Sequence, residues 1–323
     1  MAQGDSWADP IIVDNWADFL TNNVASKYVK FANPSRTITG DGSSGNPWVV
    51  STYDEMLTKT GATYIYQVKL IDREAKKYKY GDVYCIYDDS LTTIDFNNEP
   101  TMPEGGYTSD LKIEANVDFN GWTLKNITMN RCTFRMTKRN KNARISNLLV
   151  YGYFSGSAFY LDAGCEHFIV SMHVNNDSGN TQTAIYTPTN ELYGWTSGSL
   201  SLRCTGKVAV GIAIFINTTV NLNVNSSQFT MQSTYFKNAL VTGDVVITDT
   251  SVFSIGHTIN NSIFDFNHTG TETITVYSSV NSVSVYNSDK FSVTPKTNLI
   301  GVDTATLKSA SDLADVGFPI GVD

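Results

Sequence analysis

The chain has 323 residues and a formal net charge of 23 − 31 = −8, and 41% of its residues are apolar while only 17% are charged. Seventeen tyrosines, 16 phenylalanines and 5 tryptophans exclude an intrinsically disordered chain. The acidic balance argues against nucleic acid as a partner, and the lack of a long apolar run argues against a membrane-spanning helix. Ser, Thr, Asn and Gln make up close to a third of the chain.

Neither export nor metal binding is indicated by the sequence. The first residues lack the basic and apolar regions of a secretory signal, so we expect assembly inside the producing cell. The four cysteines are widely spaced and form no CxxC pair, and the four histidines form no HExxH pattern. We therefore expect buried free thiols and no metal or cofactor; the cysteines are Cys85, Cys132, Cys165 and Cys204.

The first element in chain order is a short helix near residue 16. Asp14 is placed to cap it, and Trp16, Phe19, Leu20 and Val24 recur at helical spacing. The pattern predicts one apolar face formed by these four residues. Such a helix can cover the open end of a larger structure.

Two further helices are predicted, one in the N-terminal part and one near the end of the chain. Thr52 and Glu55 form a capping-box pattern, and Gly61 supplies a C-terminal stop. Apolar residues at helical spacing predict a last helix over 304–316, which is followed by the tail 317–323. The rest of the chain is typical of strands and turns.

Strand signals begin at 62–71 and 82–87 and become repetitive from 111 onward. Short alternating or β-branched runs are separated by Asn, Ser, Gly or Asp. Their spacing is irregular and averages about 23 residues, which is a solenoid period. The runs begin at residues 145, 168, 200, 220, 244, 259 and 283.

The polar composition also favours a solenoid. Stacked parallel strands align identical side chains in ladders, so Asn, Ser and Thr are favoured and like charges are penalised. A β-sandwich remains the alternative, because it can reach this length. We predict an all-β fold: a right-handed single-stranded parallel β-helix over 51–302, with an N-terminal anchoring and capping segment over 1–50 and a C-terminal capping helix and tail over 303–323.

Several motifs carry a family resemblance. They resemble the beginning of a pectate-lyase-like right-handed parallel β-helix, over about 90 residues of the chain. The resemblance implies the fold, but the same scaffold serves lyases, hydrolases and inert structural proteins. The motifs are Asn46-Pro47-Trp48, the segment 52–57, Ile94-Asp95-Phe96-Asn97 and the segment 118–126 with the sequence DFNGWTLKN.

The small helical N-terminus, the missing signal and the GFPIG tail are similar in style to bacteriophage virion proteins. This resemblance implies a tail spike or fibre, or a head fibre or decoration protein, located on the virion. It also implies a homotrimer that contacts other virion proteins through its N-terminal segment and reaches host-surface polysaccharide. A polysaccharide lyase or glycoside hydrolase of a tailspike is the alternative function.

Catalytic candidates are sparse. Lyases of this superfamily hold calcium with several acids, whereas the acids after residue 145 are thinly spread. The densest group is Asp162, Glu166 and His167, which we assign to an exposed turn, and Asp88-Asp89 and the pair Glu114 and Asp118 receive the same interpretation. We therefore predict no catalytic residues and a non-enzymatic protein.

Two binding hypotheses remain. The run YGYFSGSAFY offers Tyr151, Tyr153 and Phe154 as carbohydrate-binding aromatics, although alternation directs part of this run into the core. The acid-free segment 131–144 is either a basic loop or a docking patch for an acidic partner. Its cations are Arg131, Arg135, Lys138, Arg139, Lys141 and Arg144.

Overall fold

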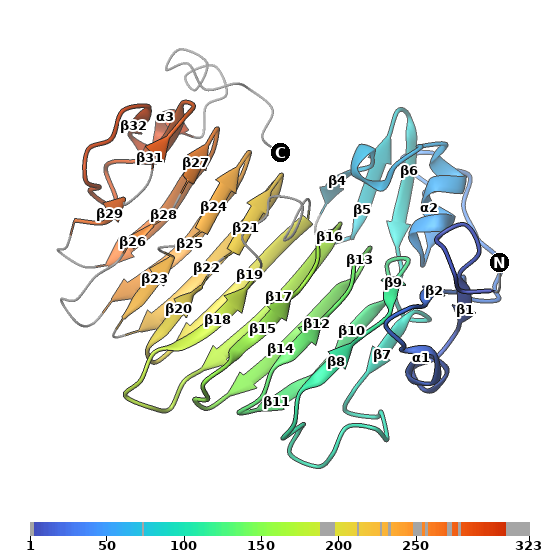
Figure 1. Ribbon diagram of the computed structural model, residues 1–323. Coiled ribbons are helices and arrows are strands. Elements are labelled where there is room, and N and C mark those ends of the chain that lie inside the picture. The colour runs from blue at the N-terminus through green and yellow to red at the C-terminus, as the bar shows by residue number, and fades with distance from the viewer. Residues whose placement is uncertain are drawn as a thin grey trace.

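A computed structural model gives the fold and describes residues 3–307, apart from 73, 188–197, 212, 227, 232–233, 248–253, 256–257, 270–272 and 277–278. Parallel strands stack into a coil with three faces (Figure 1). The longest face, called the long sheet, runs through β7 (Thr93–Asp95), β10 (Thr123–Lys125), β14 (Arg144–Tyr151), β17 (Phe168–Asn175), β19 (Gly198–Thr205), β22 (Thr218–Ser226), β25 (Leu240–Ile247), β28 (Ile263–Thr269), β31 (Ser284–Asn287) and β32 (Leu299–Val302), with β11 (Thr128–Asn130) beside β14.

The other two faces complete each turn. The second sheet contains β8 (Leu111–Ile113), β12 (Phe134–Met136), β15 (Ser157–Leu161), β18 (Gln182–Tyr186), β20 (Val208–Val210), β23 (Phe229–Met231), β26 (Ser254–Ile255) and β29 (Thr275–Val276). The third face contains two sheets: β1 (Ile11–Val13), β2 (Tyr28–Phe31), β9 (Asn116–Asp118), β13 (Asn140–Lys141) and β16 (Cys165–Glu166), then β21 (Ala213–Ile216), β24 (Thr234–Lys237), β27 (Thr258–Asn260) and β30 (Ser279–Val280). The predicted all-β parallel β-helix is confirmed.

The repeated runs of the sequence become successive strands of the long sheet. Ile145 pairs with Val170, Val170 with Leu200, and Leu200 with Val220, all in parallel. The turns differ in length, as the irregular spacing predicts. Apolar residues of each strand alternate with polar ones, so one set fills the coil and the other faces outward.

Aromatic side chains stack between turns inside the coil. Phe134 lies on Phe159 with ring centroids 5.5 Å apart, Phe159 continues to Phe168 at 6.2 Å, and Phe215 lies on Phe236 at 5.7 Å. All five rings belong to one apolar core that follows the coil. The four cysteines are buried and free, as predicted. Burial raises the pKa of the Cys85 and Cys132 thiols to about 11, so they remain unreactive thiols at neutral pH.

Asparagines form the turn between the third face and the long sheet. Asn217, Asn238 and Asn261 occupy this place in successive turns with φ of 50°, 50° and 47°. The Nδ2 of Asn238 donates to Asn217 Oδ1 at 2.9 Å, and that of Asn261 donates to Asn238 Oδ1 at 2.8 Å. Asn tolerates this left-handed conformation better than most residues. The ladder accounts for asparagine at this position of successive turns.

The N-terminal segment is built into the coil. Helix α1 (Trp16–Asn22) covers its first turn, and Trp16 and Phe19 are buried. The predicted cap was one residue off, because Asn15 and not Asp14 accepts from the backbone N–H of Asp18. Leu20 and Val24, which the sequence placed on the buried face, are 36% and 51% exposed. The helix is too short to bury its second turn.

The coil's third face begins before the boundary expected at residue 50. Strands β1 and β2 pair with each other, and β2 pairs with β9 of the coil. A smaller sheet, called the side sheet, projects beside this end (Figure 1). It contains β3 (Trp48–Val50), β6 (Val83–Tyr87), β5 (Lys77–Tyr80) and β4 (Lys69–Asp72), with helix α2 (Tyr53–Thr60) and the 3₁₀ turn η1 (Ile65–Gln67). The continuous strand expected over 62–71 is thus divided between η1 and β4.

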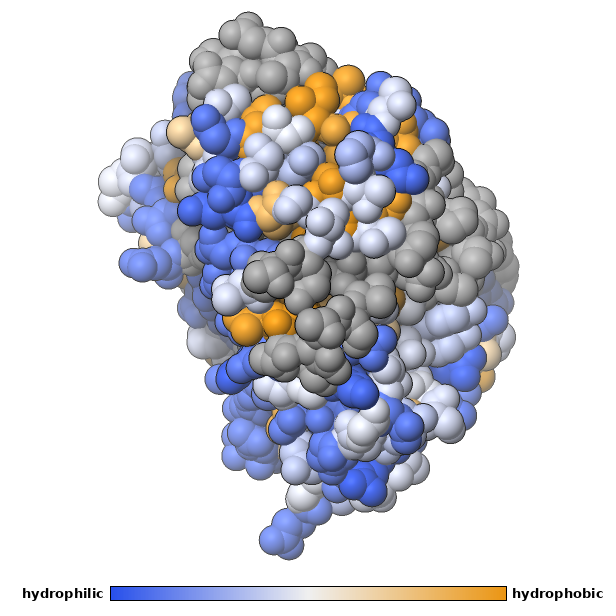
Figure 2. All heavy atoms as spheres, turned by 90° about the vertical axis from the view of Figure 1, so that its left-hand side faces the viewer, coloured by the Kyte–Doolittle hydropathy of each residue, from blue (hydrophilic) through white to orange (hydrophobic). Residues whose placement is uncertain are grey.

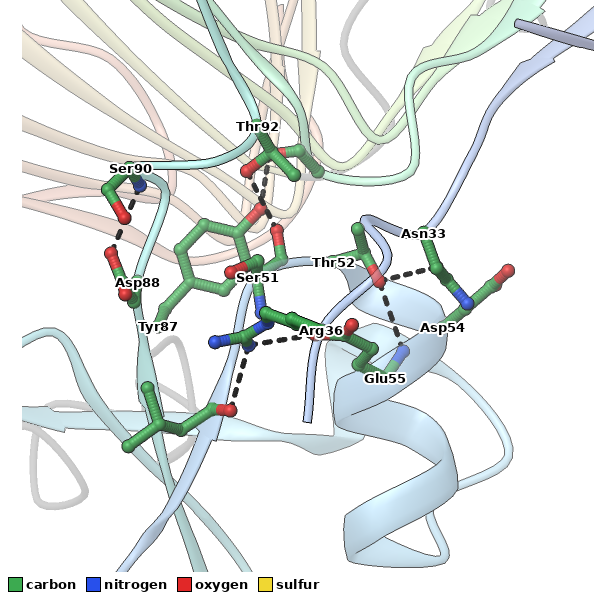
Figure 3. A network of polar contacts seen from close by, with 12 residues as sticks. Asn33, Arg36, Ser51, Thr52, Asp54, Glu55, Tyr87, Asp88, Ser90 and Thr92 are labelled. Carbon is green, nitrogen blue, oxygen red and sulfur yellow. Dashed lines mark hydrogen bonds and ion pairs between the residues drawn. The ribbon is translucent and has the colours of Figure 1, made fainter. Parts of the chain in front are cut away.

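A buried polar network fastens α2 to the coil (Figure 3). Thr52 Oγ1 accepts from the Glu55 backbone N–H at 3.2 Å, and Gly61 ends the helix with φ of 73°, as predicted. The Glu55 carboxylate does not complete a capping box; it accepts from Ser51 N–H at 2.7 Å and from Arg36 Nη2 at 3.0 Å. The Thr52 hydroxyl therefore caps the helix, and the Glu55 carboxylate joins its first turn to Ser51 and Arg36.

The opposite end carries α3 (Thr304–Leu307), which packs on β31. The remainder of the helix expected over 304–316, and the tail 317–323, lie outside the described residues. Figure 2 looks onto this end and shows apolar side chains gathered on it. A small apolar cluster lies there, formed by Ile263, Val285, Val302 and Leu307. No helix in the described part of the chain is long and apolar enough to cross a membrane.

A glycine in the long sheet is required by close approach between turns. Gly243 has φ of 122°, and a Cβ there would overlap the carbonyl oxygen of Leu222 in the preceding turn. We expect Gly243→Ala to lower the free energy of unfolding by about 3 kcal/mol through backbone strain and overpacking. Urea denaturation measures the loss. Gly45→Ala is the control, because a Cβ there meets nothing within 4 Å, and equal stability of both variants would contradict this account.

Candidate functional site

The basic segment does not form one patch, because the coil distributes its cations around a full turn. Arg131 follows β11, Arg135 lies on the second sheet, Lys141 on the third face, and Arg144 on the long sheet. Lys138 and Arg139 lie between the second sheet and the third face. A single partner surface therefore contacts only part of the set.

Most of these cations pair with an acid of another turn. Arg135 donates to Asp162 through Nε at 2.8 Å and Nη2 at 3.1 Å, and its guanidinium lies 4.5 Å from the Tyr160 ring centre. The other pairs are Arg131 with Asp177 at 3.0 Å, Arg139 with Glu166, and Lys141 with Asp118 at 3.3 Å. The basic segment therefore ties neighbouring turns together.

The same pairs occupy the strongest catalytic candidates of the sequence. Asp162 is held by Arg135 at the end of β15, and Glu166 is held by Arg139 in β16. Each carboxylate has its own arginine. Glycoside hydrolysis uses two carboxyl groups that flank one bond, one protonated and one ionised. Asp162 and Glu166 are each bound instead to an arginine, which favours the ionised form of both. The described residues contain no group of three His, Cys, Asp or Glu side chains that could hold a metal ion.

Asp118 and Asp88 also have structural partners. Asp118 accepts from the Asn120 backbone N–H at 2.9 Å and from Asn142 Nδ2 at 2.8 Å, in the turn that leads to the long sheet. Asp88 accepts from the Ser90 N–H at 3.0 Å, and the hydrogen bonds to Ser90 lower the pKa of its carboxyl. Both acids stabilise turns, as the sequence interpretation expects, but Asp118 is buried rather than exposed.

Only one of the predicted sugar-binding aromatics is broadly accessible. Tyr151 is 43% exposed at the end of β14, whereas Tyr153 is half-buried and Phe154 packs against the core. Phe159 lies inside the coil, which confirms that part of the run points inward. Tyr160 faces outward and stacks on Tyr186 at 4.7 Å. The structure therefore does not bring Tyr151, Tyr153 and Phe154 together as one exposed platform.

His167 is the histidine with the most distinctive environment. It takes the left-handed turn position that asparagines occupy in other turns, with φ of 50°, and its ring stacks on Tyr66 at 5.6 Å. Burial lowers the pKa of its imidazole to about 4, although Glu166 opposes this shift. The folded protein therefore holds His167 neutral at physiological pH.

The His167 pKa predicts a pH dependence of stability. The unfolded chain protonates His167 near pH 6.5 and the folded chain only near pH 4, so stability is complete above about pH 6.5 and falls as the pH drops. We expect His167→Asn to flatten this slope while preserving the turn. The urea midpoints of the wild type and the variant at pH 7.5 and pH 5 measure this slope. Part of the slope should remain in the variant, because burial also lowers the pKa of His173. A slope equal to that of the wild type would contradict the role assigned to His167.

The sequence did not predict that polar residues align on the outer face of the long sheet. Ser171, Ser201, Asn221 and Thr242 follow one another across successive strands. Asn221 Nδ2 donates to Thr242 Oγ1 at 3.0 Å. The alternation of each strand contains this signal, but only the register between turns shows that the polar residues form one lane.

A hollow lies where this lane approaches the side sheet. It has a volume of about 560 Å³ and is lined by residues of four long-sheet strands and by Lys76, Asp89 and Ser90. No protein-family model matches the chain, and no curated protein or solved structure is significantly similar to it. The candidate surfaces therefore rest on their own geometry.

Proposed function

We propose that this chain is a non-enzymatic structural protein of a bacteriophage particle, a β-helical appendage that is a tail spike or fibre, or a head fibre or decoration. The supporting observation is the use of its charged side chains: Arg135 binds Asp162, and Arg139 binds Glu166, across turns of the coil. These ion pairs stabilise the coil in addition to the backbone hydrogen bonds between its stacked strands. The resemblance to pectate-lyase-like β-helices and to virion proteins supports the finer assignment.

The N-terminal end supplies a surface for anchoring. Ile12, Leu20 and Val24 are 53%, 36% and 51% exposed, although all are large and apolar. Residues of this kind at one end of a coil are suited to burial against another protein. We propose that they contact other virion proteins and leave the coil displayed toward the host-surface polysaccharide.

Particle incorporation tests this proposal. An antibody to this chain should label intact phage particles in electron micrographs, and Val24→Asp should abolish labelling. Leu91→Asp is the matched control, because Leu91 is similarly exposed at 54% but belongs to the loop between β6 and β7. Labelling that is absent from every particle would refute the virion assignment, and equal incorporation of both variants would refute the anchoring surface.

The proposed assembly is a homotrimer, as the virion resemblance implies. A coil with parallel faces can bury apolar side chains against symmetric copies. Size-exclusion chromatography with light scattering should give three times the chain mass of 35.5 kDa. A stable monomer at micromolar concentration would contradict the trimer.

A further inference from the structure

The hollow beside the side sheet combines positive charge with hydroxyl groups. Its floor is the outer face of the first long-sheet strands, and its wall is the segment around Lys76 and Asp89. Thr93 pairs with Thr123, Thr123 with Arg144, and Lys125 with Ser146. The register therefore places these side chains in adjacent positions on one face. The residues used below are Lys76, Asp89, Thr123, Lys125, Arg144 and Ser146.

Positive charge exceeds negative charge in this hollow. Lys76 is neutralised by Asp89, with the Nζ and Oδ1 atoms 2.9 Å apart. Lys125 is exposed and makes no ion pair with any described residue, and Arg144 adds a second cation. The nearest acid in register with Lys125 is Asp95, which accepts from Asn126 Nδ2 at 2.8 Å. A local excess of cations stands out in a chain of net charge −8.

Arg144 has no carboxylate partner among the described residues. Its guanidinium lies 4.9 Å from the Tyr87 ring centre. Its Nη1 atom is buried and has no hydrogen-bond acceptor among the described residues. A cation in this setting is stabilised by a nearby anion, because desolvation of an uncompensated charge is costly. Stacking on Tyr87 restrains the guanidinium, so less side-chain entropy is lost when an anion binds.

We propose that this hollow binds a tetrahedral oxyanion, either phosphate or sulfate, as a free ion or as a substituent of a saccharide. Lys125 and Arg144 supply the charge, and the hydroxyl of Ser146 supplies a further donor to its oxygens, whereas the Thr123 hydroxyl donates to Asp89 Oδ2 at 3.4 Å. Charge-assisted hydrogen bonds of this kind are the strong ones in proteins. The polar lane continues from the hollow along the long sheet and can contact the rest of a substituted saccharide. The proposed anion site is independent of the proposal that the protein belongs to a virion.

Isothermal titration of the full chain with inorganic sulfate and phosphate tests the site. We expect Lys125→Gln to weaken binding of both ions about tenfold or more, and Ser146→Ala to weaken it less. Lys112→Gln is the matched control, because Lys112 is an exposed lysine of the second sheet. Circular dichroism confirms that each variant is folded, and both variants avoid the buried Arg144.

Two further ligands separate the sources of the oxyanion. A sulfated disaccharide that binds more tightly than sulfate assigns the group to a saccharide, whereas equal affinity assigns a free ion. Glucuronate tests the preference for a tetrahedral group over a carboxylate. The proposal is overturned if the wild type binds neither sulfate nor phosphate, if Lys125→Gln binds as well as Lys112→Gln, or if glucuronate binds more tightly than both ions.

Discussion

Replacing Phe159 by alanine should lower the free energy of unfolding by about 3–5 kcal/mol. Phe159 is completely buried, and its ring lies between Phe134 and Phe168 of other turns. The variant leaves a cavity in the middle of the coil and interrupts an aromatic stack that joins three strands. Because each turn is stabilised mainly by its neighbours, the loss reaches the turns on both sides. Urea denaturation followed by circular dichroism measures the effect.

Tyr151→Ala is the control for this result. Tyr151 is 43% exposed at the end of a neighbouring strand, so its removal leaves no cavity in the core. We expect a change of about 0.5 kcal/mol or less. A loss of less than about 1 kcal/mol for Phe159→Ala would show that the aromatic stack does not stabilise the coil.

The second large effect is expected at Glu55. Its side chain is 6% exposed and the Arg36 side chain is 14% exposed, so the pair is shielded from water. Among the described residues, Glu55→Ala leaves Arg36 with the Val49 carbonyl, at 2.8 Å, as its one hydrogen-bond acceptor, and it removes the acceptor of the Ser51 N–H. Breaking a buried pair from one side costs about 3–5 kcal/mol. Thermal denaturation of the variant should show this loss, with α2 and the side sheet affected first.

Two variants separate charge from packing at this position. Glu55→Gln keeps an acceptor for Ser51 but loses the charge, so we expect a smaller loss than for Glu55→Ala. Asp82→Ala removes a carboxylate that is fully exposed to solvent. The Oδ1 atom of Asp82 lies 3.7 Å from the Nζ atom of Lys79. That change should stay within about 0.5 kcal/mol. Similar losses at Asp82 and Glu55 would contradict the assigned role of burial.

Local patterns in the sequence were sufficient to predict the coil. Runs such as 168–175 and 200–205 alternate apolar and polar residues, and their spacing follows the turns of the long sheet. The stop at Gly61 and the N-cap at Thr52 are also local signals, since both act within one helix. Such features depend on neighbours in sequence, so they can be identified without coordinates.

Features that depend on the register between turns could not be predicted in this way. The bond between Arg135 and Asp162 joins residues 27 positions apart, and the length of each turn decides which side chains meet. The sequence therefore left the acid-free segment as either a basic loop or a docking patch, whereas the coil divides it among three faces. The hollow near Lys125 depends on contacts between still more distant residues, because Lys76, before β5, and Asp89 and Ser90, after β6, complete it.

We propose that the coil is structural and that its acids stabilise turns. Incubation of the purified chain with acidic and capsular polysaccharides, followed by reducing-end and unsaturated-uronate assays, tests this role most directly. We expect no cleavage by the wild type, and we expect Asp162→Ala and Glu166→Ala to change only thermal stability. Cleavage by the wild type that either substitution abolishes would contradict this proposal and would establish the lyase or hydrolase alternative.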